Sequence, residues 1–175
     1  MIQINVSQLM RASIGTIRNY KIDEMVDIAG CDRPTKGEVT LLRTDKGILV
    51  KGVLNTDIEL TCGRCLNVFN YPITLKIEEV FYPTIDTTTG TSLPEPEDPD
   101  SFTINERNIL DLTEAIRQYA LMAIPMKPLC HEDCAGLCPT CGANLNQSPC
   151  DCPRPADPRW SELIKLAFDN TEKSK

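Results

Sequence analysis

Cysteine is the residue type in this chain whose spacing best fits a chemical role. Six of the nine cysteines fall within residues 130–152, two more form a pair at Cys62 and Cys65, and Cys31 stands alone. Structural zinc takes four ligands in a tetrahedron, and pairs of thiolates a few residues apart commonly supply them. The sequence therefore predicts two structural Zn²⁺ ions, for which the candidate ligands are Cys62, Cys65, Cys130, Cys134, Cys138, Cys141, Cys150 and Cys152.

The spacing favours a division of these cysteines into two sites of four. One site consists of Cys138, Cys141, Cys150 and Cys152, which are close in sequence and lose little loop-closure entropy when they meet. The other site consists of Cys62, Cys65, Cys130 and Cys134. In a rival division, the pair at 62–65 joins the pair at 138–141, and the remaining four are free or bound elsewhere. His131 is a further candidate, which can replace Cys130 as a ligand.

Such sites are poorly suited to catalysis. A site closed by four thiolates has no open position for water, and its formal charge of about −2 makes the ion a poor Lewis acid. A thioredoxin-type redox site needs its cysteine pair at a helix N-terminus, whereas the pair at 62–65 is expected between strands. The sequence has no glycine-rich phosphate loop and no deaminase signature. It thus predicts a protein that is not an enzyme.

The composition argues against disulfides as the reason for the cysteines. With 175 residues, 41% of them hydrophobic, the chain is large enough to form a core without covalent cross-links. Its N-terminus lacks the basic start and apolar run of a secretory signal, and no segment approaches the roughly 18 apolar residues of a membrane span. We therefore expect a cytoplasmic protein with no membrane partner, in which Cys31 is a free thiol in a loop.

The chain is acidic, with 25 Asp and Glu residues against 18 Lys and Arg residues and a formal charge of −7. This charge disfavours non-specific binding to RNA, because phosphate binding depends on lysine and arginine. A basic ribosomal or assembly protein fits the charge better than naked RNA does. The candidate partner-binding residues are Arg64, Arg154 and Arg159, unless these arginines only offset the charge of the thiolates.

Alternating apolar and polar residues predict strands in the first half of the chain, at residues 2–6, 16–22, 38–44, 48–54, 56–61 and 68–82. Residues 45–47 are expected to form a tight turn in which Gly47 supplies positive φ. The strands at 56–61 and 68–82 place the first cysteine pair at the tip of a hairpin. Residues 7–11 favour one short helical turn, and residues 101–104 favour a short returning strand.

Two helices are predicted after an acidic loop. Residues 83–100 are rich in Thr, Pro, Glu and Asp, so we expect a solvated loop without regular structure. A capping box of Asp111 and Glu114 begins a helix at residues 111–124, whose apolar face contains Leu112, Ile116, Tyr119, Ala120 and Ala123. A C-terminal helix begins at Asp157 and Pro158, and its apolar stripe contains Trp160, Leu163, Ile164, Ala167 and Phe168.

Together these elements predict an α+β fold. Its parts are an antiparallel β-sheet or partly open barrel, one covering helix, a cysteine-rich zinc-binding segment and a C-terminal helix. We expect a β-rich domain at residues 1–127, which includes the acidic loop at 83–100 and the helix at 111–124. Residues 128–175 are expected to form a second part that contains the zinc-binding segment and the C-terminal helix.

Four motifs spread over nearly the whole chain point to one family. They are the sequence from Cys62 to Leu66, a helix that follows an acidic loop and ends at Ile124-Pro125, the run from Cys134 to Asn146, and the sequence from Asp157 to Trp160. This set resembles the YceD-like family of large ribosomal RNA subunit accumulation proteins. The resemblance implies a bacterial or plastid setting. It also implies that the pair at 62–65 is the more general element, and that the second cysteine site is an elaboration.

Two functions from different classes follow. The first, implied by the resemblance, is a non-catalytic factor that supports synthesis, processing or stability of large-subunit ribosomal RNA during ribosome assembly. Its partner would be a ribosomal or assembly protein, or the large-subunit RNA itself. The second is a zinc-ribbon adaptor that binds a protein partner of the transcription or translation machinery. Recovery of the partner with and without ribonuclease separates the two.

Overall fold

The computed structural model describes residues 1–87, 89–94, 96, 98–153 and 159, and the chain divides into two compact units. The first, which we call the sheet unit, consists of Met1–Cys62 and Asn67–Cys130. The second, the cysteine unit, consists of Gly63–Leu66 and His131–Lys175. Among the described residues, none of the helices is both long and apolar enough to cross a membrane. The predicted domain boundary after residue 127 stays a prediction.

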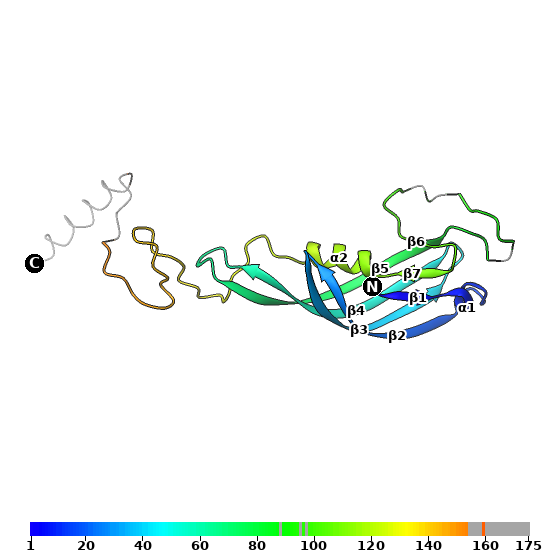
Figure 1. Cartoon of the computed structure of the whole chain (residues 1–175), viewed down its shortest axis with the longest axis horizontal. Helices are drawn as coiled ribbons and strands as arrows, with labels where there is room; N and C mark the ends of the chain where they lie inside the picture. The colour runs from blue at the N-terminus through cyan, green and yellow to red at the C-terminus, as the bar shows by residue number, and fades with distance from the viewer. Residues whose placement is uncertain (88, 95, 97, 154–158, 160–175) are drawn as a thin grey trace, which may run out of the picture. The chain divides into compact units, whose positions relative to one another are not determined.

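The described residues of the sheet unit form seven strands and two helices, which are labelled in Figure 1. The strands are β1 (Gln3–Asn5), β2 (Ile17–Ile28), β3 (Cys31–Arg43), β4 (Ile48–Thr61), β5 (Val68–Pro83), β6 (Thr103–Ile104) and β7 (Ile109–Asp111). The helices are α1 (Ser7–Met10) and α2 (Thr113–Met122). The predicted helical turn at 7–11 and the predicted returning strand at 101–104 are therefore present, as α1 and β6.

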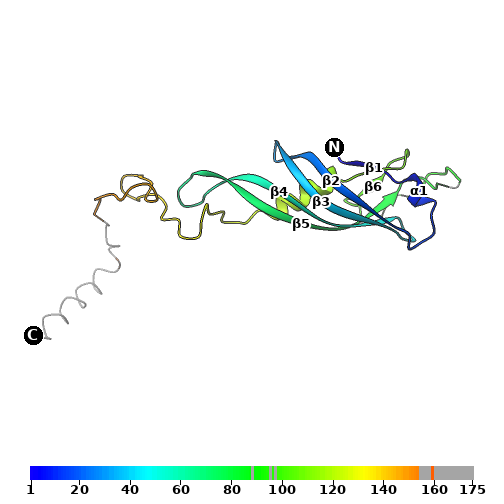
Figure 2. The same cartoon turned by 90° about the horizontal axis from the view of Figure 1, so that it is seen from below.

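All seven strands belong to one sheet in the order β1-β7-β6-β5-β4-β3-β2. Consecutive strands from β2 to β5 are antiparallel neighbours, and Figure 2 shows these four as the long strands of the molecule. The pairing of β5 with β6 is parallel. This departs from a purely antiparallel sheet, because the long connection after β5 lets the chain return to the start of a parallel neighbour, which a tight turn cannot do.

One face of the sheet is buried. It is the face onto which the alternating apolar residues of the strands point. In β4 and β5, inward residues such as Val50, Leu54, Ile73 and Leu75 alternate with exposed polar residues. Every strand and both helices contribute to one continuous hydrophobic core. Helix α2 packs against both β2 and β5, which are three places apart in the sheet, so the sheet must curl around the helix.

Helix α2 is positioned by its first turn and by one tyrosine. The Asp111 Oδ1 atom accepts the Thr113 amide at 2.9 Å, but the N-cap residue is Leu112 and no side chain caps the helix, so the predicted cap at Asp111 was wrong. Glu114 does not reach back to complete the capping box. It pairs with Arg117 at 3.5 Å instead, which places its carboxylate on the exposed side of the helix. On the sheet side, the Tyr119 hydroxyl donates to Glu79 Oε1 at 2.8 Å.

The hairpin of β2 and β3 is longer than predicted. The strands continue to a two-residue turn in which Ala29 and Gly30 both have positive φ, at 56° and 83°. Cys31 is therefore the first residue of β3, where it is exposed and opposite Ile28, and its assignment to a loop was wrong. Gly47 is needed for a different reason than predicted. It does not have positive φ, but a Cβ atom there would collide with the Phe81 carbonyl oxygen.

The acidic loop after β5 has some local order. Ile85 and Ser92 form an isolated β-bridge, and the Leu93 amide donates to the Thr84 carbonyl at 2.9 Å. Between them, the Asp86 amide donates to the Thr91 carbonyl at 2.9 Å. The described residues of this loop belong to no helix or strand, as expected, but these backbone hydrogen bonds stabilise a turn even where few apolar side chains are buried.

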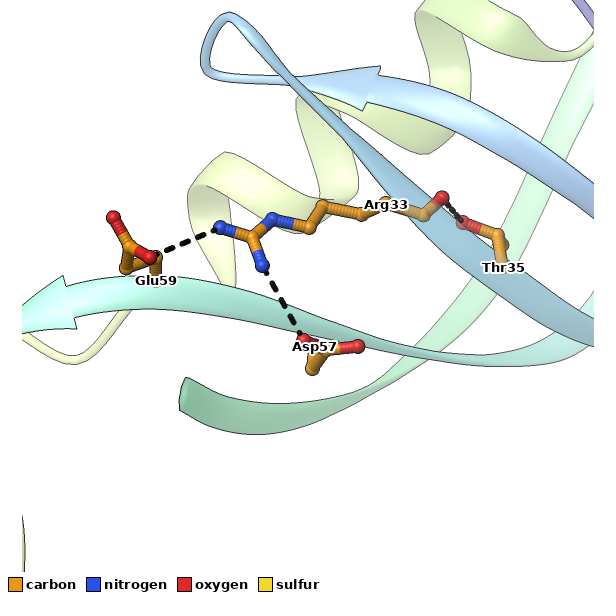
Figure 3. A network of polar contacts seen from close by, with 4 residues as sticks. All are labelled: Arg33, Thr35, Asp57 and Glu59. Carbon is orange, nitrogen blue, oxygen red and sulfur yellow. Dashed lines mark hydrogen bonds and ion pairs between the residues drawn. The ribbon is translucent and has the colours of Figure 1, made fainter. Parts of the chain in front are cut away.

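The strands β3 and β4 separate near their far ends, where Arg33 spans the gap. Their register ends at Lys36 opposite Asn55, while each strand continues in its own hairpin. As Figure 3 shows, the Arg33 guanidinium lies 3.5 Å from Asp57 Oδ2 and 3.7 Å from Glu59 Oε2. Only 16% of the Arg33 side chain is exposed, so this largely buried cation and its two carboxylates link the strands beyond the end of their backbone pairing.

The predicted α+β fold class is confirmed, with a curled sheet, a covering helix and a cysteine-rich segment. Helix α2 is two residues shorter at each end than the predicted range of 111–124. Its buried side chains include Ala115, which the predicted apolar face omits, whereas Ala123 is exposed. The predicted C-terminal helix, from Asp157 onward, lies outside the described residues.

Candidate metal centres

The first cysteine pair lies between two long strands, as its sequence context predicted. Strand β4 ends at Thr61 and β5 begins at Val68, and the residues from Cys62 to Leu66 form what we call the first knuckle. The Cys62 amide donates to the Asn67 carbonyl at 2.9 Å, and Leu66 has a φ of 58°. The chain reverses direction within this tight turn, and both Cys62 and Cys65 are buried in it.

A second knuckle, Cys138–Gly142, has the same backbone pattern inside the cysteine unit. The Cys138 amide donates to the Ala143 carbonyl at 2.8 Å, and Gly142 has a φ of 73°. An isolated β-bridge between Leu137 and Asn144 closes the loop behind it. Glycine follows Cys141 because the left-handed backbone there brings Cβ too close to a carbonyl oxygen in other residues.

Eight cysteines come together in the two groups of four that the spacing favoured. The first tetrad is Cys62, Cys65, Cys130 and Cys134, and the second tetrad is Cys138, Cys141, Cys150 and Cys152. Within each tetrad all Sγ atoms lie within 4.8 Å of one another. At a Zn–S distance of about 2.3 Å, tetrahedral zinc requires sulfurs about 3.8 Å apart. The geometry therefore fits a four-thiolate metal ion, and the rival pairing of residues 62–65 with 138–141 is not observed.

The sulfurs of the second tetrad perturb one another. The backbone amides of Cys141 and Thr140 donate to the Cys138 sulfur and lower the pKa of Cys138 from 9.0 to about 6. A hydrogen bond with Cys141 raises the pKa of Cys152 to about 12, and one with Cys138 raises the pKa of Cys150. These shifts favour the charged form of Cys138 and the neutral forms of Cys150 and Cys152, because several negative sulfurs are stable together only beside a cation.

Asn146 supports the first tetrad and was not singled out from the sequence. Its Nδ2 atom donates to the Cys134 sulfur at 3.4 Å and to Asn144 Oδ1 at 2.9 Å. Its Oδ1 atom accepts the Ala135 amide at 2.8 Å. Residues behind the ligands orient the ligands and tune the metal, so Asn146 belongs to the site. The only sequence signal was its place between the cysteines of the second tetrad.

Arg64 is directed at backbone carbonyl groups. Its Nη1 atom donates to the Cys134 carbonyl at 2.9 Å and to the Glu132 carbonyl at 3.3 Å. Gly136 lies against it, where an added Cβ would be 3.2 Å from the Arg64 carbonyl oxygen. Arg64 therefore orders the segment at 132–136 beside the first knuckle, and its proposed contact with a partner stays a prediction.

The remaining predicted residues are placed as follows. His131 is exposed and its carbonyl accepts the Cys134 amide at 3.2 Å, but it is not part of either tetrad. Arg159 is exposed, and Arg154 lies outside the described residues. None of the nine cysteines, all of which are described, forms a disulfide.

A cavity of about 290 Å³ borders the second tetrad. The described residues that line it are Ala135, Cys138, Pro139, Thr140, Leu145, Pro149, Cys150, Cys152 and Pro153. This lining contains no carboxylate and no histidine, which are the usual general bases beside a catalytic metal. The surroundings of the tetrad therefore fit a structural ion better than a catalytic one.

Comparisons with known proteins give one family. A family model described as "Large ribosomal RNA subunit accumulation protein YceD" matches residues 50–167. An uncharacterized protein of Mycobacterium bovis is 31% identical over 122 residues, which cover 69% of this chain and 56% of that protein. Another uncharacterized protein, from Mycobacterium leprae, is 25% identical over 134 residues, which cover 76% of this chain and 59% of the relative.

A plant relative carries a descriptive name. "Large ribosomal RNA subunit accumulation protein YCED homolog 1, chloroplastic" of Arabidopsis thaliana is 30% identical over 142 residues, which cover 69% of this chain and 44% of that protein. The chain thus spans about half the length of the curated relatives it matches. No solved structure matches. The family model covers more than half of the chain, including the first knuckle, the curled sheet's central strands and both tetrads, and the chain therefore belongs to the YceD family.

Proposed function

We propose that this protein is a non-catalytic factor that supports synthesis, processing or stability of large-subunit ribosomal RNA. Membership of a family named for accumulation of that RNA carries the proposal, and the name of the Arabidopsis relative supports it. We place this role in the cytoplasm, a reducing compartment in which short cysteine pairs hold metal in preference to forming disulfides.

The two tetrads are proposed to hold one structural Zn²⁺ each. Thiolates are the ligands that zinc prefers in closed sites, and four of them leave no position for a substrate. When bound, the ion would supply folding free energy on the order of 10 kcal/mol and neutralise part of the thiolate charge. In the first tetrad, the Asn146 side chain donates to the Cys134 sulfur at 3.4 Å. In the second tetrad, the Thr140 amide donates to the Cys138 sulfur, also at 3.4 Å.

The charges on the outer face of the sheet favour a basic protein over naked RNA as the direct partner. Three lysines of this face are each paired with a carboxylate on the neighbouring strand. The pairs are Lys21–Glu38 at 3.8 Å, Lys36–Asp23 at 3.1 Å and Lys51–Glu78 at 2.6 Å. A lysine that already has a carboxylate neighbour attracts phosphate weakly, so these three lysines add little of the cationic character that RNA binding requires.

Depletion of the protein tests the proposed role. We expect mature large-subunit RNA to fall while small-subunit RNA stays normal, and we expect expression of the wild-type chain to restore it. A chain with Cys138→Ser should restore it poorly, because the second tetrad loses a ligand, while Cys31→Ser, which changes the one cysteine outside both tetrads, should restore it fully. Unchanged levels of both RNAs after depletion would refute the proposal.

A zinc-ribbon adaptor that binds a protein of the transcription or translation machinery is the alternative. The formal charge of −7 favours it, since an acidic protein can bind a basic partner without touching RNA. Recovery of one protein after ribonuclease treatment, with ribosomal RNA unaffected by depletion, would support the adaptor. Loss of recovery after ribonuclease would support the role in RNA accumulation.

A further inference from the structure

The two knuckles allow one backbone position to be compared within the same chain. In each knuckle the amide of the first cysteine donates to the carbonyl five residues later, at 2.9 Å for Cys62 and 2.8 Å for Cys138. In each, the residue after the second cysteine is left-handed, with a φ of 58° at Leu66 and 73° at Gly142. The same left-handed position is thus occupied by leucine in the first knuckle and by glycine in the second.

Leucine is the unfavourable choice at such a position. A left-handed backbone brings Cβ against the following carbonyl oxygen, which glycine avoids and asparagine tolerates. Two other non-glycine residues in the described part of the chain have positive φ. Asn108 is of the tolerant type, and Ala29 belongs to the tight turn between β2 and β3. Leu66 is therefore the one large aliphatic side chain among the described residues that is held in this strained conformation.

Burial does not explain the leucine. Leu66 is 63% exposed, whereas the neighbouring Cys65 is 3% exposed. A side chain that stays in water gains little from the hydrophobic effect, so the described part of this chain does not offset the strain. We propose that Leu66 is an anchor side chain, which becomes buried in an apolar pocket of a protein partner.

The surroundings of Leu66 indicate the charge of that partner. Arg64 holds the segment at 132–134 beside the knuckle through the carbonyls of Glu132 and Cys134, at 3.3 and 2.9 Å. The side chains of Glu132 and Asp133 are exposed there. An apolar anchor with an acidic rim, on a chain of charge −7, is complementary to a basic protein surface and repels phosphate. The partner is therefore a basic protein with an apolar pocket.

Binding measurements on the full zinc-loaded chain test this proposal, which rests on the proposed ribosome-related role only for the choice of probe. The probe is the set of basic proteins that lithium chloride splits from large ribosomal subunits. Each protein retained by the wild-type chain is purified, and its Kd is measured. We expect Leu66→Gly to weaken binding at least tenfold, with unchanged zinc content and a melting temperature no lower than that of wild type, because glycine relieves the strain. Leu66→Asn, which keeps a residue suited to the left-handed backbone, should give the same loss.

Two further variants complete the experiment. The matched control is Ile14→Asn, because Ile14 is an aliphatic side chain with a similar exposure of 68%, and its Kd should not change. A double change, Glu132→Lys with Asp133→Lys, should slow association and flatten the dependence of Kd on salt. These two residues are exposed and outside the tetrads, so the folded state should be retained.

Four results would overturn the proposal. Leu66→Gly and Leu66→Asn chains that bind as tightly as wild type would remove the anchor, and a wild-type chain that binds none of these basic proteins would remove the partner. Binding of purified large-subunit RNA that falls with Leu66→Gly would make RNA the ligand. Loss of zinc from both variants would make Leu66 a shield for the thiolates. Failure of the proposed RNA role is seen separately, as unchanged large-subunit RNA after depletion of the whole protein.

Discussion

Asp111 is a residue whose ionisation links the start of α2 to pH. Partial burial acts to raise the pKa of Asp111, but hydrogen bonds from Thr113 and Gln3 and the charge of the N-terminus hold it below the usual value of 3.8. A carboxyl group with a lowered pKa in the folded state contributes stability above its unfolded-state pKa. That contribution is lost as the pH falls through the folded-state pKa. We predict that Asp111→Asn lowers the free energy of unfolding near neutral pH by about 0.5 kcal/mol.

The pH dependence distinguishes this electrostatic effect from a loss of packing. The difference between wild type and Asp111→Asn should shrink as the pH drops below 3.8, because the wild-type carboxyl group then also becomes neutral. Urea unfolding of both chains, once near neutral pH and once below pH 3.8, measures this difference in the free energy of unfolding. A difference that is the same at both would mean that the charge of Asp111 does not contribute.

Asn146 offers a second prediction at the scale of one side chain. Asn146→Leu keeps a similar volume but removes the donor to the Cys134 sulfur and the acceptor of the Ala135 amide. Loss of such supporting hydrogen bonds typically weakens metal binding by about 10- to 100-fold. We expect one of two zinc ions to be released at correspondingly lower concentrations of a chromophoric chelator. The neighbouring change Gln147→Leu, at an exposed amide, should leave both release curves unchanged.

The candidate site could be predicted from sequence as far as the cysteines themselves. Their spacing identified the candidate ligands and favoured the observed grouping, because short loops between ligands limit the possible partners. Asn146 and the contacts of Arg64 could not be predicted, since they depend on how the loop around the second knuckle folds back. The conformation of Leu66 could not be predicted either, because leucine is not a residue type that favours positive φ.

At the scale of elements, Arg33 lies where two hairpins separate. Where β3 and β4 stop pairing, its guanidinium lies between the carboxylates of Asp57 and Glu59. Replacement by methionine leaves two carboxylates without their cation. Because their side chains are 37% and 56% exposed, water screens them, and the cost should be below that of breaking a fully buried pair. We predict a loss of about 1 kcal/mol for Arg33→Met in urea unfolding.

A neighbouring ion pair provides the control for Arg33. Lys21 and Glu38 pair across β2 and β3 at 3.8 Å, but their side chains are 87% and 71% exposed. Lys21→Met should therefore change the free energy of unfolding by less than about 0.5 kcal/mol. High salt should reduce the cost of Arg33→Met only in part, since the guanidinium is largely buried. Equal effects of the two substitutions would contradict the bridging role of Arg33.

The strands were predictable where one face is buried, as in β4 and β5, because alternation records burial directly. The ends of β2 and β3 were not, since residues 23–36 are mostly polar or exposed and Ala29 is not a typical turn residue. The parallel pairing of β5 and β6 depends on a contact across the acidic loop, which no local pattern records. Gly47 was correctly placed in a turn, but its close approach to Phe81 comes from the neighbouring strand.

At the scale of the whole molecule, the two units differ in what stabilises them. The hydrophobic core of the sheet unit draws on every strand and both helices, from Ile2 to Ala120. In the described part of the cysteine unit, the buried apolar residues are Cys65, Cys134 and Cys138. A segment of this size without aliphatic side chains in its interior cannot bury enough surface to fold by the hydrophobic effect alone. We therefore expect the stability of this described part to depend on metal ions bound by the sulfurs.

This difference predicts the outcome of metal removal. A strong chelator should leave the far-UV circular dichroism of the sheet and the methyl resonances of core residues such as Val39, Leu41 and Val50 unchanged, because their burial needs no ion. The amide resonances of residues 131–153 should move to random-coil values, since binding free energy there is also folding free energy. Native mass spectrometry should find two zinc ions before chelation and none after it. Simultaneous loss of the core methyl resonances would mean that the sheet depends on metal as well, and retention of dispersed amides at 131–153 would mean that the cysteine unit folds without it.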